Sequence, residues 1–325
     1  MNGGDKTDIV VLGAGVIGLV TSLRLLERGY SVTILADAFS PHTTSNVAGA
    51  LWYPHRVGPT ERVDGWCRRS YPVFRELCSN PAAGVALRPL LVLPGCEEKP
   101  PAWSDVAGLQ LVGRDKLPPG YDCGFAMLAP VVESDVFLAW LLSRVRELGA
   151  VVEPVAASLT SFEPLFARGR VVVHCTGIGA RKLVDDRDLH PVRGQLLRVE
   201  GPRIVRSICD DGGPLAGTYV IARTHDTIVG TTHNVGDWNL DVYPGETMDI
   251  LARATRLVPE LSGARILDQR VGLRPARSGV RLEVEHTAAG PVVHHYGHGG
   301  AGVTLSFGCA DEAAGLVEDL LGPRR

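Results

Sequence analysis

A short glycine-rich turn near the N-terminus constrains the fold of this chain more than any other feature. Residues 8–12 form an apolar, β-branched run that is typical of a buried parallel strand. The turn Gly13-Ala14-Gly15-Val16-Ile17-Gly18 follows at once, and apolar residues at helical spacing then lead to Gly29. A second apolar run covers residues 30–35 and ends just before Asp37. Strand, turn, helix, strand and acid together predict the βαβ unit of a Rossmann-like domain.

In this context the G-x-G-x-x-G pattern predicts a dinucleotide site. The glycines let the backbone approach a pyrophosphate closely, and the free N–H groups at the helix N-terminus bind the phosphate charge. Asp37 lies 24 residues after Gly13, where an acid commonly binds the ribose hydroxyls. Such an acid favours FAD or NAD over a cofactor that carries a 2′-phosphate.

Two later passages have the same character. Ser134 or Asp135 can cap a helix that ends at Gly149, and residues 151–155 and 171–175 are typical strands. Near the end of the chain, residues 291–296 form a strand-like run, a glycine-rich turn covers 297–302, and a helix is expected from about Cys309 to Leu321. A second helix start of this kind can place N–H donors where negative charge develops on a reduced flavin, which favours FAD over NAD.

The intervening segments differ from these glycine-bounded blocks. Residues 60–130 are rich in Pro, Arg and Gly and show only short periodic pieces, whereas residues 193–240 alternate apolar and polar side chains as strands do. One helix is expected from Gly245 to Leu257. We therefore expect an α/β fold with a Rossmann-like FAD-binding domain of residues 1–57, 133–192 and 265–325, and a mainly antiparallel β-sheet substrate domain of residues 58–132 and 193–264.

Composition excludes several classes of function. Charged residues make up 21% of the chain and the formal net charge is −3, so no basic surface for nucleic acid or for an anionic membrane is expected. The longest apolar stretch, residues 9–20, is too short to span a bilayer. Seven cysteines without a CxxC pair predict scattered thiols in a reducing compartment. Together with a polar start and no peroxisomal address, this favours the cytoplasm.

Several motifs resemble those of the D-amino-acid oxidase and D-aspartate oxidase family. The run from His295 to Thr304 (HYGHGGAGVT) is similar to the C-terminal signature of that family, and Gly272 to Arg277 (GLRPAR) resembles its substrate-arginine segment. Further similar stretches are residues 36–44, 50–54, 174–177, 193–195 and 236–238. The resemblance implies an FAD-dependent oxidase that converts a D-amino acid and O₂ to a 2-oxo acid, ammonia and hydrogen peroxide.

The resemblance also implies roles for individual residues. Arg274 would pair bidentately with the substrate carboxylate, Tyr219 would donate its hydroxyl to the same group, and the Gly300 carbonyl would accept a hydrogen bond from the substrate amine. The residues expected to hold FAD are Gly13, Gly15, Val16, Ile17, Gly18, Asp37, Thr44, Ser45, Gly49, Leu51, Val173, Gly299, Gly300, Ala301, Gly302 and Thr304.

Selectivity for the substrate side chain is expected from Tyr53, His55, His233 and Arg223. D-aspartate oxidases of the family carry an arginine on the strand that leads into the Gly-Asp-Trp segment, where this chain has His233 with Arg223 nearby. A histidine there can hold an acidic substrate or satisfy a local carbonyl. We expect a preference for neutral D-amino acids, with acidic ones second.

Other functions stay open on the sequence alone. A flavin oxidase of glycine or of a secondary amine shares the fold, a nicotinamide-dependent dehydrogenase shares the turn, and a non-catalytic FAD-binding protein would need no substrate arginine. His294, His295 and His298 lie across a strand and a glycine turn with no nearby carboxylate or cysteine in sequence, so no metal site is expected. The oligomeric state is open, with a homodimer as one candidate.

Overall fold

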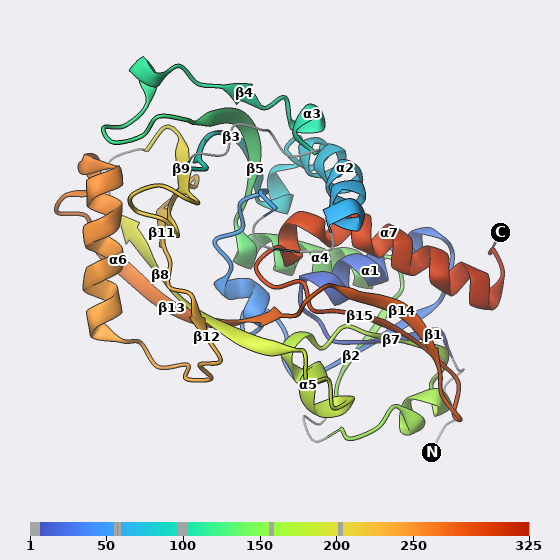
Figure 1. Ribbon diagram of the computed structural model, residues 1–325. Helices are drawn as coiled ribbons and strands as arrows, with labels where there is room; N and C mark the ends of the chain where they lie inside the picture. The colour runs from blue at the N-terminus through green and yellow to red at the C-terminus, as the bar shows by residue number, and fades with distance from the viewer. Residues whose placement is uncertain are drawn as a thin grey trace.

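Two β-sheets with helices between and outside them make up the computed structural model, which describes residues 7–54, 57, 60–95, 103–155, 159–200 and 204–324 (Figure 1). The first sheet has six strands in the order β14 (Arg281–His286), β15 (Pro291–Tyr296), β7 (Gly169–His174), β1 (Thr7–Leu12), β2 (Val32–Ala36) and β6 (Val151–Pro154). All neighbours pair in parallel except β14 and β15. The expected Rossmann-like sheet is therefore present.

Strand order in this sheet determines where a ligand can bind. From β1 the chain moves outward to β2 and β6 on one side, and then returns to β7 and β15 on the other side. Ligands of such sheets bind at the carboxyl ends of the strands where the order reverses. In this chain that point lies between β1 and β7, directly at the Gly13 turn.

The second sheet is mainly antiparallel, as expected. Its order is β12 (Asn234–Val235), β8 (His190–Glu200), β11 (Thr227–Gly230), β10 (Thr218–Ala222), β9 (Ser207–Asp210), β3 (Val85–Leu93), β5 (Phe125–Val132) and β4 (Gln110–Leu111), and β13 (Arg265–Ala276) also pairs with β8. The β3–β9 pair is parallel. The predicted FAD-binding domain included residues 265–276, yet β13 pairs along its length with β8 and so belongs to the second sheet. The division into two domains stays a prediction.

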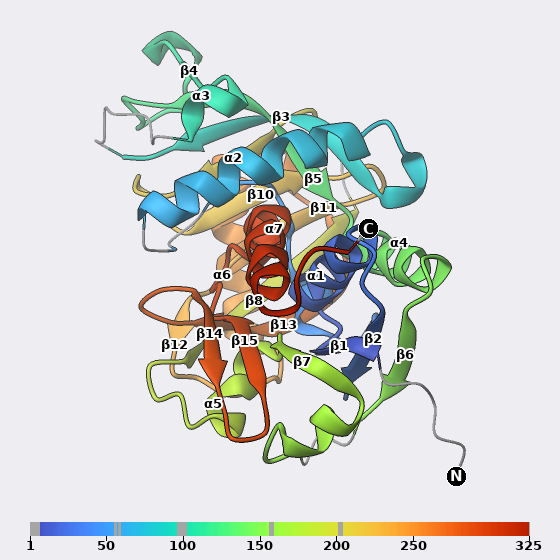
Figure 2. The ribbon, with the colours of Figure 1, turned by 90° about the vertical axis from the view of Figure 1, so that its right-hand side faces the viewer.

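Helices cover the sheets in two groups. The chain's first and last long helices, α1 (Val16–Glu27) and α7 (Gly302–Leu321), pack side by side with α4 (Ser134–Glu147) and α2 (Thr60–Leu77), as Figure 2 shows. The helix α6 (Pro244–Leu257) packs on β8, β10 and β11 of the second sheet. Two single-turn helices, α3 (Ser104–Ala107) and α5 (Ala180–Leu183), complete the set among the described residues.

Three expectations about helices need correction. The helix α2 was not predicted because Pro72 interrupts its pattern, although Val63, Trp66 and Phe74 form a buried face. The helix α7 begins at Gly302, seven residues before the expected start. Gly308 lets α7 pack closely against α2, because a Cβ at this position would lie 2.6 Å from the Cα of Trp66. The side chains expected to cap α4 bind elsewhere, with the Ser134 hydroxyl donating to the Ala48 carbonyl.

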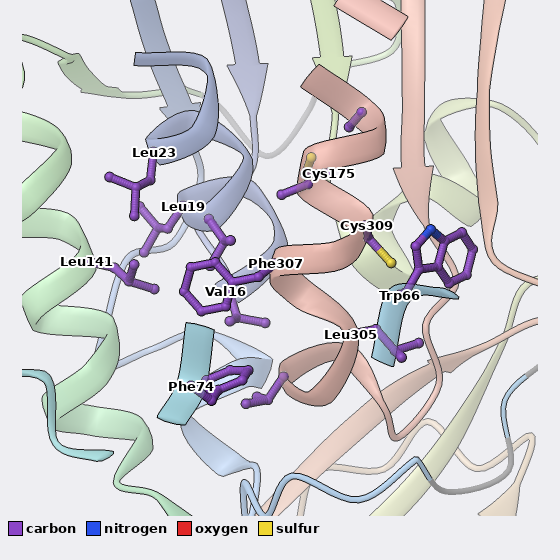
Figure 3. Close-up of a cluster of buried hydrophobic side chains, with 14 of the residues drawn as sticks. Val16, Leu19, Leu23, Trp66, Phe74, Leu141, Cys175, Leu305, Phe307 and Cys309 are labelled. Atoms are coloured by element: carbon purple, nitrogen blue, oxygen red, sulfur yellow. The ribbon is translucent and has the colours of Figure 1, made fainter. Parts of the chain in front are cut away.

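One buried apolar cluster contains side chains from the helices α1, α2, α4 and α7 and from strands of both sheets. Figure 3 shows part of it, with Phe74 from α2, Leu141 from α4 and Phe307 from α7 meeting Val16 and Leu19 from α1. The Phe74 and Phe307 rings lie 5.1 Å apart with an edge-to-face angle of 78°. Because these helices share one core, the N-terminal ends of α1 and α7 are held at fixed positions relative to each other.

Candidate active site

A cavity of about 900 Å³ opens where the two sheets approach each other. That volume lies at the upper end of the range for small-molecule and cofactor sites. Of the residues expected to hold FAD, those in the lining are Gly13, Gly15, Val16, Ile17, Asp37, Thr44, Ser45, Gly49, Leu51, Gly299, Gly300, Gly302 and Thr304. The fold therefore brings the first and the last thirds of the chain to one site.

The three glycines of the first turn meet different structural requirements. Gly13 has φ +113°, and a Cβ there would lie 2.8 Å from the carbonyl carbon of Cys175. Gly18 packs α1 onto the same turn, since its Cβ would lie 2.9 Å from the carbonyl carbon of Gly13. At Gly15 the nearest described atom is only the Ser45 hydroxyl at 3.2 Å. Gly13 and Gly18 thus serve packing, whereas Gly15 leaves room for a ligand at the helix N-terminus.

The N-terminus of α1 suits a pyrophosphate. Gly15 provides no side-chain cap and the first turn of α1 contains no acid, so no negative charge of the helix itself neutralises its positive end. The Val16 amide donates to the Ser45 hydroxyl at 3.0 Å, and this bond joins the segment around Ser45 to the glycine turn. Asp37 follows β2 directly, is exposed and lines the cavity, as a ribose-binding acid requires.

The N-terminus of α7 lies at another part of the same cavity. Ala301 precedes this helix without a side-chain cap, and its first turn again has no acid. The Thr304 hydroxyl lies 3.4 Å from the Leu51 carbonyl and 3.3 Å from both the amide and the carbonyl of Tyr53. The segment from Leu51 to Tyr53 is therefore attached to the helix start, so the residues present fit a dinucleotide cofactor held between two helix N-termini.

Three residues expected at the FAD site do not line the cavity. Val173 is fully buried within β7, where it pairs with Val11 and Val293. Gly18 is turned toward the Gly13 backbone, and Ala301 is a buried residue whose amide donates to the His298 carbonyl at 3.0 Å. Any contact of these residues with FAD stays a prediction.

Arg274 lines the cavity, and its guanidinium is held by two neighbouring threonines. Its Nη1 donates to the Thr232 carbonyl at 3.1 Å and its Nη2 donates to the Thr231 hydroxyl at 2.8 Å. A Cβ at Gly194 would lie 2.5 Å from the Arg274 Cζ, so the guanidinium lies directly over this glycine. A Cβ at Gly300 would lie 3.5 Å from the Arg274 Cδ. The side chain is thus held between two strands and the glycine turn.

Tyr219 lines the cavity from β10. It pairs with Gly230, where a Cβ would lie 2.5 Å from the Tyr219 hydroxyl oxygen. Burial raises the pKa of the Tyr219 hydroxyl, and the nearby Arg274 opposes that shift. The hydroxyl therefore keeps its proton at neutral pH and is available as a donor. Sequence reasoning found Arg274 and Tyr219 but missed the space that Gly194 and Gly230 leave for them.

The four expected selectivity residues have different positions. Tyr53 and His233 line the cavity. Arg223 does not, because its guanidinium donates to both carboxylate oxygens of Asp226 at 2.6 and 2.7 Å and its side chain is 7% exposed. In this structure the arginine holds the turn between β10 and β11, and any contact with a substrate stays a prediction. His55 lies outside the described residues.

An acid that the sequence did not single out lies at the same end of the cavity. Asp211 follows β9, lines the cavity and accepts a hydrogen bond from the Tyr53 hydroxyl at 2.6 Å. The preceding residue, Asp210, also borders the cavity, but its carboxylate accepts hydrogen bonds from the Tyr121 hydroxyl at 2.5 Å and the Leu215 amide at 2.8 Å. No signal in the sequence indicated which protein groups would bind each of these two adjacent aspartates.

Comparisons with known proteins agree with this geometry. A family profile described as FAD dependent oxidoreductase matches residues 8–316. The chain belongs to this FAD-dependent oxidoreductase family. It is 42% identical to a D-amino-acid oxidase of Rubrobacter xylanophilus over 95% of each chain, and 39% identical to one of Streptomyces coelicolor over 95% of this chain and 96% of that one. A human D-aspartate oxidase is 36% identical over 97% of this chain and 96% of its own.

Solved structures share the fold of this family member. Glycine oxidase from Geobacillus kaustophilus superposes with a TM-score of 0.78 at 20% identity and covers 97% of this chain and 95% of its own. L-proline dehydrogenase from P. horikoshii gives a TM-score of 0.82 at 14% identity over 99% and 95% of the two chains. No helix among the described residues is long and apolar enough to cross a membrane.

Proposed function

We propose that this FAD-dependent oxidoreductase is a D-amino-acid oxidase. The overall reaction would convert a D-amino acid, O₂ and water to a 2-oxo acid, ammonia and hydrogen peroxide. The observation that carries the proposal is the Arg274 guanidinium, which lies beside Gly300 in the cavity that the cofactor glycines also line. The relatives named D-amino-acid oxidase support it at 42% and 39% identity over nearly the whole chain.

Arg274 is arranged to bind a carboxylate. Its bonds to the Thr232 carbonyl and the Thr231 hydroxyl use one N–H on each terminal nitrogen. A guanidinium has two N–H groups on each of these nitrogens, and we propose that remaining N–H groups donate to the two oxygens of a substrate carboxylate. We infer that the Tyr219 hydroxyl donates to the same carboxylate.

The substrate amine would be fixed at the other side of the site by the Gly300 carbonyl. Bound FAD supplies the acceptor for the hydride that leaves the substrate Cα. The protein then has to orient that hydrogen, keep the amine unprotonated and exclude water. No side chain has to remove a proton from the carbon, and Arg274 together with a backbone carbonyl can present one enantiomer to the cofactor.

We further propose that neutral D-amino acids are preferred over acidic ones. Asp211 lies in the cavity, where its carboxylate disfavours a second carboxylate on the substrate side chain. Arg223 is already paired with Asp226 and cannot attract one. Oxidation of glycine or of a secondary amine would use the same carboxylate clamp and is the alternative to be separated by experiment.

An anaerobic spectrum with a matched substrate panel tests the proposal. Purified holoenzyme should bleach its flavin absorbance with D-amino acids and not with their L enantiomers, and in air it should release one hydrogen peroxide per substrate. Arg274→Ala should keep bound FAD and lose most of the activity, whereas Arg223→Ala should keep the substrate profile. A protein that bleaches with glycine or sarcosine but with no D-amino acid would refute the assignment.

We also propose a cytoplasmic location and a homodimer. The proposed location rests on the scattered cysteines, of which Cys67, Cys78, Cys175, Cys209 and Cys309 are free thiols in the structure. Cell fractionation tests the location. Light scattering coupled to gel filtration tests the dimer, which a monomer mass would exclude.

A further inference from the structure

Three metal-ligating side chains meet in the interior beside the cofactor cavity. His295 lies on β15, His298 lies in the following turn, and Cys309 lies about two helical turns into α7. One ligand atom from each residue lies within 4.8 Å of the others, and the residues are 0%, 2% and 0% exposed. Figure 3 shows Cys309 on α7 within the packed interior.

Hydrogen bonds around His295 determine which ring nitrogen carries its proton. The Thr21 hydroxyl donates to the Ile17 carbonyl at 2.7 Å, so it is left to accept from the His295 Nδ1 at 3.1 Å. A neutral imidazole with its proton on Nδ1 has a bare lone pair on Nε2. That is the form of histidine that binds metal ions, with the other nitrogen held by a hydroxyl or carbonyl.

Each of the two histidines has one ring nitrogen without a hydrogen-bond partner among the described residues. Nε2 of His295 and Nε2 of His298 are both buried without a hydrogen-bond partner there. Buried polar atoms are nearly always paired, so two adjacent unpaired nitrogens call for a common explanation. The Cys309 thiol has one proton and can satisfy at most one of them.

We propose that His295, His298 and Cys309 bind a zinc ion whose fourth coordination position faces the cofactor cavity. Two imidazole nitrogens and a thiolate are ligands that Zn²⁺ prefers, at about 2.0–2.1 Å and 2.3 Å. Closing a cluster of this size onto those distances requires ligand movements of roughly 1 Å. His295 and His298 also line the cavity, which provides an entry path.

Binding is balanced by loss of the thiol proton. The Cys309 S–H bond breaks, the sulfur keeps the electron pair and bonds to Zn²⁺, and one proton leaves to solvent. Both histidines bind zinc as neutral ligands, so neither of them releases a proton. The expectation of no metal site rested on the lack of a nearby cysteine in sequence, and only the tertiary structure brings Cys309 to the histidines.

Zinc content of the holoenzyme tests this inference independently of the oxidase activity. After chelator treatment and zinc addition, elemental analysis should find about one zinc per chain in the wild type. His295→Asn, His298→Asn and Cys309→Ala should each weaken zinc binding by at least about tenfold, a range typical of lost or altered ligands. Cys78→Ala is the matched control, because this thiol donates to the Phe74 carbonyl outside the cluster.

Zinc-edge X-ray absorption of the wild type gives a readout that needs no variant. One sulfur near 2.3 Å and two nitrogens near 2.0–2.1 Å are expected. Zinc uptake that is equal in wild type and Cys309→Ala, at unchanged FAD content and melting temperature, would overturn the proposal. A spectrum with oxygen ligands only would do the same.

Discussion

A single methyl group at Gly194 should disable the site without unfolding the protein. In Gly194→Ala the new Cβ would lie 2.5 Å from the Arg274 Cζ, whereas carbon atoms in contact are about 3.5 Å apart or more. The guanidinium must therefore move by about 1 Å. Because the obstacle is the end of a flexible side chain rather than backbone, β8 and β13 can keep their pairing.

The expected loss follows from that displacement. Moving a positioning group by about 1 Å can reduce the rate by about 100-fold, which corresponds to about 2.7 kcal/mol in the transition state. We expect kcat/KM for the best D-amino acid to fall by about that factor. The loss should be shared by all substrates with a carboxylate, because the same clamp holds each of them.

The assay combines steady-state peroxide release with two measurements on the free protein. Flavin absorbance reports FAD content and thermal unfolding reports Tm, and both should stay close to the wild type. Gly245→Ala in the first turn of α6 is the control, because a Cβ there meets no described atom within 4 Å. A Gly194→Ala protein with kcat/KM within about twofold of wild type would show that Arg274 does not position the substrate.

Three further perturbations separate the roles of other residues. Gly15→Ala should weaken FAD binding in a titration of the apoprotein and leave the Tm of the apoprotein unchanged. Gly13→Ala should lower that Tm, because Gly13, unlike Gly15, has a positive φ and backbone atoms against its Cβ. Equal effects of the two substitutions would contradict the assigned roles. Arg223→Ala should lower the unfolding free energy by roughly 3 kcal/mol, since it leaves the 3% exposed Asp226 with less compensation, and an altered substrate profile would count against its structural role. Burial lowers the pKa of His174 well below its usual value of about 6.5, so the stability it contributes is complete above that pH and is lost as the pH falls below it. Tm should therefore fall between about pH 7.5 and pH 5.5, and less so in His174→Gln; an equal fall in both proteins would exclude this residue as the cause.

Local sequence was sufficient where a single stretch of chain contains the whole structural signal. The first βαβ unit is such a case, because its strand, turn and helix follow one another and their periodicities switch within 30 residues. The alternating strands β8, β10 and β11 were predicted for the same reason. The helix α2 was missed because Pro72 weakens its propensity, and its stability comes from packing against α7.

The candidate site was predictable only in part. Arg274 and Tyr219 were identified by resemblance, and the structure brings both into one cavity. Arg223 was assigned by its nearness in sequence to the substrate segment, but its partner Asp226 lies three residues away and pairs with it first. Asp211 was not recognised because only its tertiary partner, Tyr53 rather than Tyr121, distinguishes it from Asp210.

Residues that are neighbours in the chain were enough to establish the Rossmann-like turn, the kind of cofactor and the family. The tertiary structure alone decided which groups face the cavity and which are already paired, because those contacts join positions far apart in sequence. The approach of Gly194 to Arg274 and of Cys309 to His295 and His298 are examples. Side-chain direction and long-range contact are set by the packing of two sheets around a shared helical core, and no local pattern encodes them.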